Sequence, residues 1–174
     1  SGPDTHHPAI EYNYFKMINE AETSIYIQTP YFIPEESVIN ALKIAAISGI
    51  DVKIIIPSKP DHPFVKWANL SYIGELLEAG AKCYEYKKGF VHSKLILIDG
   101  KISSVGSANM DIRSFKLNFE INSFIYDKNV TEKFEKVFID DLNDCKQIFY
   151  EDYLQRSNFT KIKESISRLF APLL

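Results

Sequence analysis

The sequence predicts a layered α/β domain built on a mixed β-sheet, and two patterns lead to this prediction. The first half of the chain alternates apolar, β-branched runs with stretches of helical periodicity, which is typical of parallel strands connected by helices. Further along, Asp99-Gly100 separates two short apolar runs, a strong signal for a hairpin with antiparallel strands. Hydrophobic residues make up 45% of the 174 residues, which is enough for the core of one domain.

Helices are indicated by apolar residues three or four positions apart and by residues that begin or end a helix. Pro34 followed by Glu35 and Glu36 suits a helix start, because acidic side chains favour the positive end of the helix dipole. Gly49 and Gly80 stand where the second and third helices should end. We expect helices over residues 9–22, 35–48, 64–78 and 131–150.

Strands are indicated by short runs that are rich in β-branched and aromatic residues. The run 51–56 is almost wholly apolar, as expected for a strand buried on both faces of a parallel sheet. The other expected strands cover residues 24–29, 81–86, 93–98, 103–105 and 118–126.

Composition limits the kind of protein. With a net charge of −3, the chain lacks the overall excess of Lys and Arg with which proteins grip a nucleic-acid backbone. Cys83 and Cys145 are far apart and fit a reducing compartment better than a disulfide scaffold. No run approaches the roughly 18–20 apolar residues that span a bilayer, and no signal segment is present. We expect a piece of a longer protein, with one domain over residues 1–155 and an amphipathic helix over 156–174.

The chemically informative residues lie between positions 92 and 109. Alternation along a strand would place His92 and Lys94 on the same face, where both can reach one ligand. Imidazole can attack phosphorus or protonate a leaving alkoxide, and the Lys94 ammonium can neutralise a phosphate. Ser107 and Asn109 follow a strand end, the usual ligand position in α/β sheets, and add neutral hydrogen-bond donors. This set of groups requires no metal.

Each piece alone has an ordinary explanation. A lone His on a strand is usually a satisfied residue, and Asp99 before a glycine is usually a hairpin turn. Together, however, the residues from His92 to Asn109 form the pattern His-x-Lys-x4-Asp-x6-Gly-Ser-x-Asn. This complete pattern resembles the phospholipase D superfamily.

A narrower resemblance covers nearly the whole chain. The chain looks like the C-terminal half of a bacterial cardiolipin synthase. The segments that carry this likeness are 1–4, 26–34, 74–80, 106–115, 118–120 and 168–174. The resemblance implies a phospholipase D-like α/β/α sandwich, in which residues 1–155 are the C-terminal one of two catalytic domains.

The resemblance also implies a catalytic role for the motif His92, Lys94 and Asp99. The family joins two such motifs across a shared cleft, and the N-terminal histidine is usually the nucleophile that becomes phosphohistidine. His92 would then protonate the leaving alcohol and later deprotonate the acceptor. Asp99 would anchor the motif without touching substrate.

Three further roles follow from the same resemblance. Lys94, Ser107 and Asn109 would bind the phosphate oxygens of the substrate. Glu120 matches a family acid that hydrogen-bonds the catalytic imidazole, so it would orient that ring and stabilise its charged form. An ordinary acid on a strand surface is the alternative for Glu120.

The implied reaction transfers a phosphatidyl group between two phosphatidylglycerol molecules and gives cardiolipin and glycerol, without a cofactor. The implied partners are an anionic membrane surface and an N-terminal motif-bearing half, or a second copy of the chain; nucleic acid is not expected. We expect the full-length protein at the bacterial cell membrane and this fragment to be soluble on the cytoplasmic side. The alternatives are a dimeric phospholipase D-like nuclease and a lipid-binding half without activity of its own.

Several other residues allow two interpretations each. Tyr31-Phe32 could line the mouth of the cleft or pack in the core, and Asp61-His62 could contact a polar headgroup or lie in a solvated loop. Asp111 and Arg113 could pair with each other, or Arg113 could bind phosphate.

The last segment has apolar residues at helical spacing, flanked by Lys161, Lys163 and Arg168. It could lie on an anionic bilayer or pack on the core of the domain, and we expect packing. The apolar residues are Phe159, Ile162, Ile166, Leu169, Phe170 and Leu173.

Overall fold

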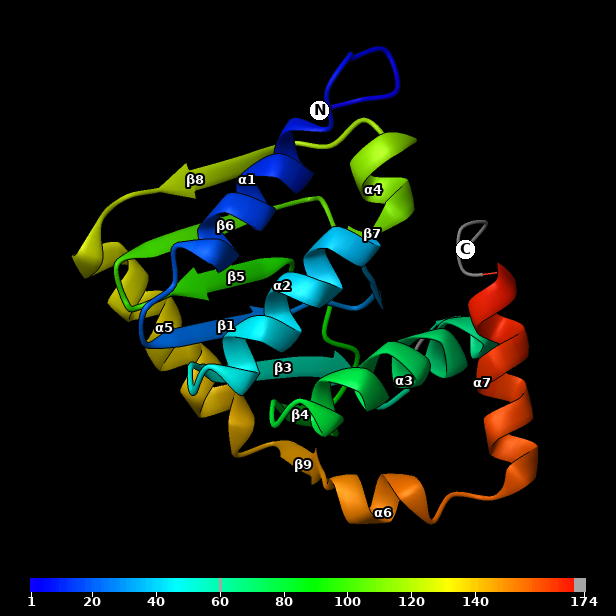
Figure 1. Cartoon of the computed structure of the whole chain (residues 1–174). Coiled ribbons are helices and arrows are strands. Elements are labelled where there is room, and N and C mark those ends of the chain that lie inside the picture. The colour runs from blue at the N-terminus through cyan, green and yellow to red at the C-terminus, as the bar shows by residue number, and fades with distance from the viewer. Residues whose placement is uncertain (60, 171–174) are drawn as a thin grey trace.

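The computed structural model describes residues 1–59 and 61–170, which fold around one seven-stranded sheet in the order β8-β6-β5-β1-β3-β4-β9. Helices α1 to α3 cover one face of this sheet and α5 covers the other (Figure 1). The sheet is mixed, so the predicted layered α/β/α architecture is confirmed. Within these residues, no helix has both the length and the apolar character needed to cross a bilayer.

The centre of the sheet is parallel because its strands are connected by helices. Strands β1 (Ser24–Gln28), β3 (Asp51–Pro57) and β4 (Lys82–Tyr86) run in the same direction. Helices α2 (Glu36–Ile47) and α3 (Pro63–Glu78) make the two connections. Each helix is followed by a glycine with positive φ, Gly49 at 91° and Gly80 at 95°, a conformation that favours residues without a Cβ.

The antiparallel part of the sheet holds the motif. Strands β5 (Leu95–Ile98) and β6 (Ile102–Gly106) form the predicted hairpin, and β5 also pairs antiparallel with β1. Asp99 and Gly100 both have positive φ, 55° and 62°, as the tightest hairpin turns require. β8 (Asn122–Ile125) pairs with β6.

The structure differs from the predicted elements near the middle of the chain. The expected strand 118–126 begins only at Asn122, and a short helix α4 (Ile112–Lys116) precedes it. A two-residue strand β2 (Phe32–Ile33) pairs in parallel with β7 (Met110–Asp111), which joins two segments far apart in sequence. Pairings between distant segments of this kind leave no periodic signal in a short sequence window.

The predicted helix 131–150 is wrong at both ends. Helix α5 (Lys128–Leu142) begins earlier because the carboxylate of Asp127 caps it, accepting a hydrogen bond from the Val130 N–H at 3.0 Å. After α5 the chain forms β9 (Cys145–Ile148), which pairs antiparallel with β4 and becomes the edge strand, and then α6 (Tyr150–Leu154). The free edge of β4 therefore pairs with residues 145–148, which the local pattern predicted as part of the helix 131–150.

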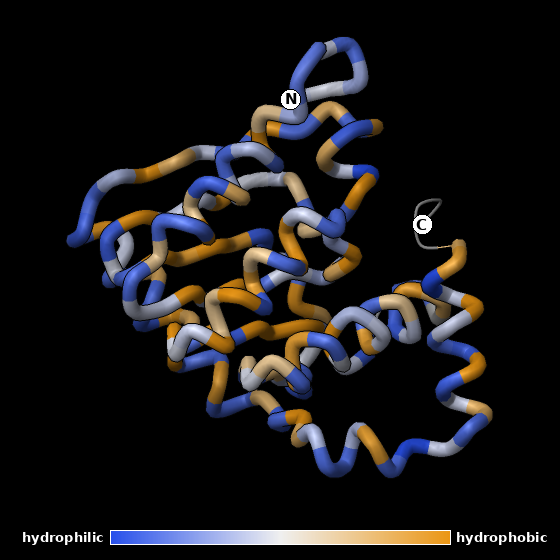
Figure 2. The backbone as a smooth tube through the Cα atoms, viewed as in Figure 1, coloured by the Kyte–Doolittle hydropathy of each residue, from blue (hydrophilic) through white to orange (hydrophobic). Residues whose placement is uncertain are grey.

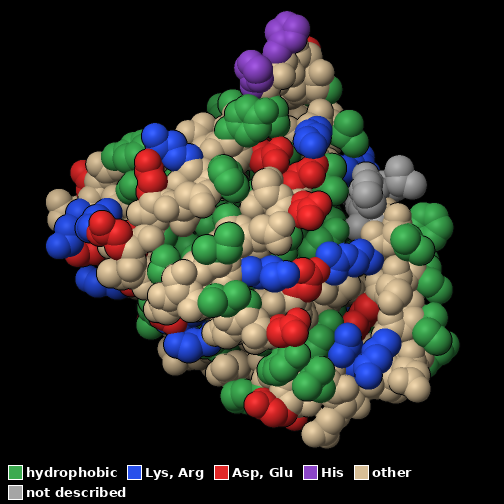
Figure 3. Space-filling view, viewed as in Figure 1, with side chains coloured by type: hydrophobic (Ala, Val, Ile, Leu, Met, Phe, Trp, Pro, Cys, Tyr) green, Lys and Arg blue, Asp and Glu red, His purple; other side chains and the backbone are tan. Residues whose placement is uncertain are grey.

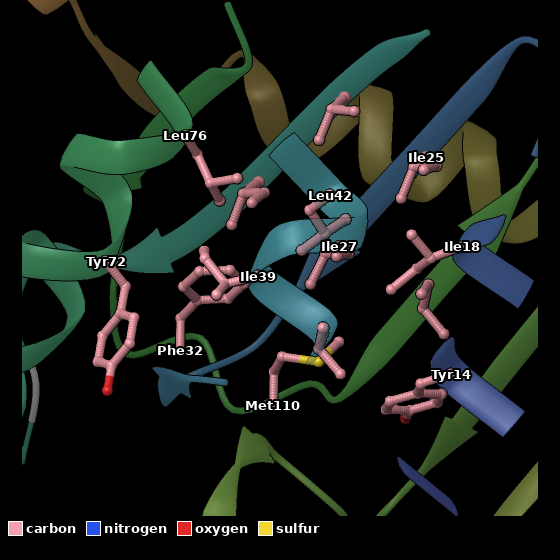
Figure 4. Close-up of a cluster of buried hydrophobic side chains, with 14 of the residues drawn as sticks. Tyr14, Ile18, Ile25, Ile27, Phe32, Ile39, Leu42, Tyr72, Leu76 and Met110 are labelled. Carbon is pink, nitrogen blue, oxygen red and sulfur yellow. The ribbon is translucent and has the colours of Figure 1, made fainter. Parts of the chain in front are cut away.

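The larger core lies between the sheet and helices α1 (Ala9–Asn19), α2 and α3. Figure 4 shows its centre, where Ile25 and Ile27 of β1 point toward Ile18 of α1 and Leu42 of α2. The hydrophobic colouring of the central strands in Figure 2 marks this layer. A smaller cluster on the opposite face packs Tyr26 against Phe138 of α5, with ring centroids 5.1 Å apart.

Helix α7 (Asn158–Phe170) contacts α3, but not with the side that its sequence predicts. Its polar Glu164 and Ser167 are buried against the domain, whereas the described members of its apolar stripe are exposed. The helix therefore packs on the domain as expected, but with its polar side instead of its apolar stripe; the last member of the stripe, Leu173, lies outside the described residues. The division at 155/156 falls between α6 and α7 and stays a prediction.

Candidate active site

The segments that carry His92, Lys94, Ser107 and Asn109 lie at the sheet edge where β1 and β3 end and β5 begins (Figure 1). The segments that follow β1, β3 and β6, together with the segment that precedes β5, all reach this edge. These segments lie close together, since the negative charges of Glu120, Asp111 and Asp61 each raise the pKa of the Lys94 ammonium. Such an edge is where α/β sheets present ligand-binding groups.

Gly106 is required by the close approach of β8. A Cβ at this position would collide with the backbone of Ile121 and Asn122. The Gly106 N–H donates to the carbonyl of Lys94 at 3.3 Å, and the Ser107 N–H donates to the carbonyl of Ile121 at 2.9 Å. The glycine of the motif thus connects the lysine segment to β8.

Lys94 and His92 lie just outside the sheet rather than on a strand. β5 begins at Leu95, two residues later than predicted, because β1 ends opposite Leu95 and no ladder continues toward His92. Alternation along β5 therefore does not extend to the pair. The imidazole of His92 is exposed and lies beside the ring of Phe90, with centroids 5.7 Å apart.

Lys94 is only 7% exposed, and its Nζ donates to the carbonyl oxygen of His92 at 2.8 Å. Burial lowers the pKa of Lys94, while the negative charges of Glu120 and Asp111 oppose this change. An ammonium group held in this way carries charge in a region of low solvation, where its attraction for an anion is strong.

Glu120 is held by neighbouring polar groups. The hydroxyl of Ser107 donates to one carboxylate oxygen of Glu120, and the Asn118 amide donates to the other at 3.3 Å. The Ser107 hydroxyl in turn accepts the Ile121 N–H at 3.0 Å. The side chain of Glu120 thus hydrogen-bonds Ser107 and Asn118, and its role at the imidazole of His92 stays a prediction.

Asn109 is fixed from two sides. Its backbone N–H donates to the hydroxyl of Ser114 at 3.1 Å, and its side chain hydrogen-bonds the carboxylate of Asp111. Asp111 also accepts the Ser114 N–H at 2.7 Å and caps α4. The Oδ1 atom of Asn109 is buried without a hydrogen-bond partner among the described residues. Because an amide nitrogen has two hydrogens, Asn109 can serve both Asp111 and a ligand oxygen.

The loops after β1 and β3 meet beside this site. The phenol of Tyr31 donates to the carboxylate of Asp61 at 2.6 Å, and Asp61 is exposed in the loop after β3, as expected for a solvated loop residue. Burial, together with this hydrogen bond, raises the pKa of Tyr31 to about 12. Phe32 is fully buried and belongs to the core, whereas His62 stacks on the exposed ring of Phe64. Arg113 is exposed and lies in electrostatic range of Tyr31.

Asp99 lies at the other end of β5. Its carboxylate accepts hydrogen bonds at 2.8–2.9 Å from the backbone N–H groups of Glu22, Thr23 and Ser24. The helix predicted over 9–22 ends at Asn19, and these N–H groups pair with Asp99 instead of continuing it. At roughly 3.3 Å per strand residue, Asp99 is on the order of 15 Å from Lys94. At this separation Asp99 and Lys94 cannot both contact one phosphate group.

Comparison with known proteins decides the family. Residues 14–142 match the family described as cardiolipin synthase, PLD-like domain. The chain belongs to this family.

Curated relatives of this PLD-like domain match it along all of its residues. The major cardiolipin synthase ClsA of Bacillus subtilis is 56% identical over 174 residues, and a cardiolipin synthase of Oceanobacillus iheyensis is 55% identical. Cardiolipin synthase of Listeria monocytogenes is 52% identical. In each case the chain spans 100% of its own length and 36% of the relative's length.

Solved structures share the fold of this PLD-like domain. The phospholipase D family member Nuc from Salmonella typhimurium has a TM-score of 0.67 at 21% identity, covering 79% of this chain and 90% of that one. Phosphatidylserine synthase from Haemophilus influenzae has a TM-score of 0.72 at 16% identity and covers 99% of this chain and 44% of that one.

Sequence reasoning missed several residues that shape the PLD-like site. Asn69 of α3 is buried; it accepts the Phe32 N–H at 2.9 Å and donates to the Pro30 carbonyl at 3.0 Å. Asn122 accepts the Ala108 N–H at 3.2 Å. The available signal for Asn69 was a polar residue in the apolar register of a helix, which usually needs a specific partner.

Proposed function

We propose that this chain is the C-terminal catalytic half of a cardiolipin synthase, which transfers a phosphatidyl group between two phosphatidylglycerol molecules at the bacterial cell membrane. One observation carries the proposal. A chain 56% identical along its whole length to the B. subtilis ClsA protein gathers the lysine, asparagine and glutamate of its motif at one sheet edge, beside an exposed histidine.

In the proposed first step, the histidine of the motif in the N-terminal half attacks the phosphorus of one phosphatidylglycerol. The P–N bond forms as the P–O bond to glycerol breaks, and His92 gives its proton to the leaving glycerol oxygen. In the second step His92 takes a proton from a hydroxyl of another phosphatidylglycerol. The new P–O bond forms as the P–N bond breaks, which yields cardiolipin. The exposure of His92 supports this assignment, because the second motif must approach it from outside the chain.

The phosphate is held by groups of this half. Lys94 supplies a poorly solvated positive charge, and Asn109 supplies an amide N–H whose position is fixed by Asp111. Ser107 adds a hydroxyl, although its bond to Glu120 must rotate or be shared when a ligand binds. Glu120 carries negative charge toward the same edge, which would favour a protonated His92.

A phospholipase D-like nuclease is the second candidate, since the fold matches 90% of the length of the Salmonella Nuc chain. The net charge of −3 argues against a grip on nucleic acid. A lipid-binding half that is inactive alone is the third possibility and agrees with a site that needs a second imidazole.

The test uses full-length protein in phosphatidylglycerol vesicles containing EDTA. We expect cardiolipin to form without added metal and His92→Ala to abolish it, while His6→Ala in the exposed N-terminal loop leaves the rate unchanged. Normal cardiolipin output from His92→Ala would contradict the proposal. Nicking of single-stranded DNA by the 174-residue chain, lost in His92→Ala, would support the nuclease instead.

A further inference from the structure

Helix α7 is oriented with its polar side inward. Glu164 and Ser167 are 3% and 1% exposed, whereas Phe159 and Leu169 are 66% and 79% exposed. Ile162, Ile166 and Phe170 are also exposed. A helix on the surface of a globular protein normally turns its apolar face toward the core. The apolar side of α7 is instead exposed on the surface formed by the described residues (Figure 3).

Specific contacts fix this orientation. Glu164 accepts hydrogen bonds from Arg156 at 2.9 Å and from the phenol of Tyr153 at 3.3 Å. Further along α7, Arg168 pairs with Glu75 of α3, and its guanidinium lies 4.3 Å from the ring centroid of Tyr72. Rotating the helix to bury its apolar side would leave Glu164 and Glu75 without these partners, so the outward stripe is built into the fold.

The beginning of α3 extends the apolar surface. The exposed Phe64 and the half-buried Trp67, together with Lys163, Ile166 and Ser167 of α7, line an apolar hollow. We call the combined surface of the exposed apolar residues of α7 with Phe64 and Trp67 the α7–α3 face. Lysines surround it: Lys163 Nζ lies 4.3 Å from the ring centroid of Phe159 and 5.0 Å from that of Trp67.

The charges of this face suit an anionic partner. Lys161 and Lys163 are the lysines of α7, whereas its Arg168 is paired with Glu75 and its acid, Glu164, points into the domain. Lys66 of α3 adds another cation beside Trp67. Since the whole chain carries a net charge of −3, this basic rim is a local feature. Aromatic and aliphatic side chains framed by lysines are typical of helices that lie in the interface of an anionic bilayer.

The α7–α3 face adjoins the candidate active site. Phe64 is three residues from Asp61, which accepts the hydrogen bond of Tyr31 at the site. Arg168 of α7 lines one hollow together with Pro34 and Ile112, and Ile112 follows Asp111 directly. Figure 1 shows α7 at the same end of the sheet as β7 and α4, on the right of the view. A bilayer against this face would bring lipid headgroups to the sheet edge that carries Lys94.

We propose that the α7–α3 face docks on an anionic lipid bilayer and inserts its apolar side chains between headgroups. The inference rests on the proposed function for its purpose, because a phosphatidylglycerol substrate lies in such a bilayer. It deepens that proposal by naming the surface through which the domain reaches the lipid. Binding does not depend on His92, so docking and catalysis can fail separately.

The sequence offers a probe at the right place, since Trp67 is the single tryptophan of the 174 residues. The test adds phosphatidylglycerol vesicles with brominated acyl chains to the 174-residue chain, with folding checked by circular dichroism. We expect a blue shift and quenching of Trp67 fluorescence, and no response to phosphatidylcholine vesicles. His92→Ala should bind equally well. Absence of quenching with phosphatidylglycerol would overturn the proposal.

Paired variants distinguish insertion of the α7–α3 face from nonspecific hydrophobic adsorption to vesicles. Ile162→Ser with Leu169→Ser should weaken vesicle binding at least about tenfold. The control is Val137→Ser with Ile139→Ser, which removes two exposed apolar residues from α5 on the opposite face of the sheet and should leave binding unchanged. Equal losses in both double variants would overturn the assignment of the surface.

Charge and the other half of the protein complete the test. Lys161→Gln with Lys163→Gln should weaken binding to phosphatidylglycerol vesicles by roughly fivefold per lysine. In lipid-free full-length protein, the backbone amides of α7 should exchange hydrogen for deuterium as fast as they do in the 174-residue chain. Strong additional protection of α7 without lipid would identify the remaining part of the protein as the occupant and overturn the lipid assignment. Full-length protein with Ile162→Ser and Leu169→Ser should lose cardiolipin synthesis on vesicles. The same variant should keep this activity on phosphatidylglycerol dispersed in detergent.

Discussion

The two ends of β5 belong to one motif but use their polar groups differently. At one end the carboxylate of Asp99 accepts hydrogen bonds from the backbone N–H groups of Glu22, Thr23 and Ser24. At the other end His92 is exposed, and Lys94 is buried with a neutral carbonyl as its hydrogen-bond acceptor. The comparison teaches that the motif contains an anchor, whose interactions stabilise the fold, and charged groups whose interactions are completed by a ligand.

Lys94→Met breaks the ligand end and should have the largest effect. Because the ammonium would stabilise negative charge on the transferring phosphate, we expect cardiolipin synthesis by the full-length protein to fall by roughly 100- to 1,000-fold. The melting temperature should stay the same or rise, since Met fills similar space without the cost of burying a charge. Initial rates and thermal unfolding measure the two effects.

Lys101→Met is the matched control for this experiment. Lys101 lies in the hairpin at the Asp99 end of β5, and its side chain is 62% exposed. Neither rate nor melting temperature should change by much. A large loss of stability in Lys94→Met with a normal rate would reverse the assignment and make Lys94 a structural residue.

Asp99→Asn tests the anchor end. Asparagine keeps the size of the side chain and tolerates the positive φ of this position, so the variant isolates the loss of a charged acceptor. We expect the free energy of unfolding to fall by about 2 kcal/mol, as for hydrogen bonds to a charged group. The rate per folded molecule should remain near normal. Urea unfolding together with activity measures this, and a normal unfolding curve with lost activity would place Asp99 in the chemistry.

The pH dependence of stability should separate the anchor from a second acid, Asp111. Burial alone would raise the pKa of Asp99, but the hydrogen bonds from Ser24, Glu22 and Thr23 outweigh it and lower the pKa. Its stabilisation is present above the unfolded value of about 3.9 and is lost as pH falls through the folded pKa. Burial raises the pKa of Asp111, so its contribution is complete below about pH 3.9 and is lost as pH rises through the folded pKa.

These signs give opposite expectations for two variants. The difference in unfolding free energy between wild type and Asp99→Asn should shrink as the solution is acidified. The difference between wild type and Asp111→Asn should grow in favour of the wild type. Urea unfolding between pH 3 and pH 7 measures both, and parallel pH profiles of the two variants would contradict the opposite directions of the pKa shifts.

The sequence predicts the elements whose stability is local. The run 51–56 and the Asp99-Gly100 hairpin are found as predicted, because apolar strands and positive-φ turns depend on neighbouring residues. The strand β9 was predicted as helix, because only the distant edge of β4 specifies it. Likewise, the inward orientation of Glu164 depends on Arg156 and Tyr153, whereas periodicity indicates only that one side of α7 is apolar.

The candidate site shows the same limit. The spacing of the motif places His92, Lys94, Ser107 and Asn109 at one edge, since strand ends determine where they lie. The residues that hold Asn109 and the loop after β1 could not be predicted in this way. Asp111, Ser114 and Asn69 act through single hydrogen bonds between segments, and no repeat or spacing distinguishes them from ordinary polar residues.

Tyr31→Phe should give the smallest effect and sharpens the comparison. Tyr31 stands at the ligand end of the sheet, but its phenol is already paired with Asp61, as the groups around Asp99 are paired. It should therefore behave like part of an anchor: the free energy of unfolding should fall by up to about 1 kcal/mol, with the rate changed by less than about fivefold. Because the pKa of Tyr31 is raised to about 12, the folded hydroxyl stays protonated, and the effect on stability should be constant from about pH 6 to pH 9 and should shrink as the pH rises through the unfolded value of about 10. A rate loss as large as that of Lys94→Met would mean that position in the sheet, rather than the pairing of polar groups, decides which residues take part in the chemistry.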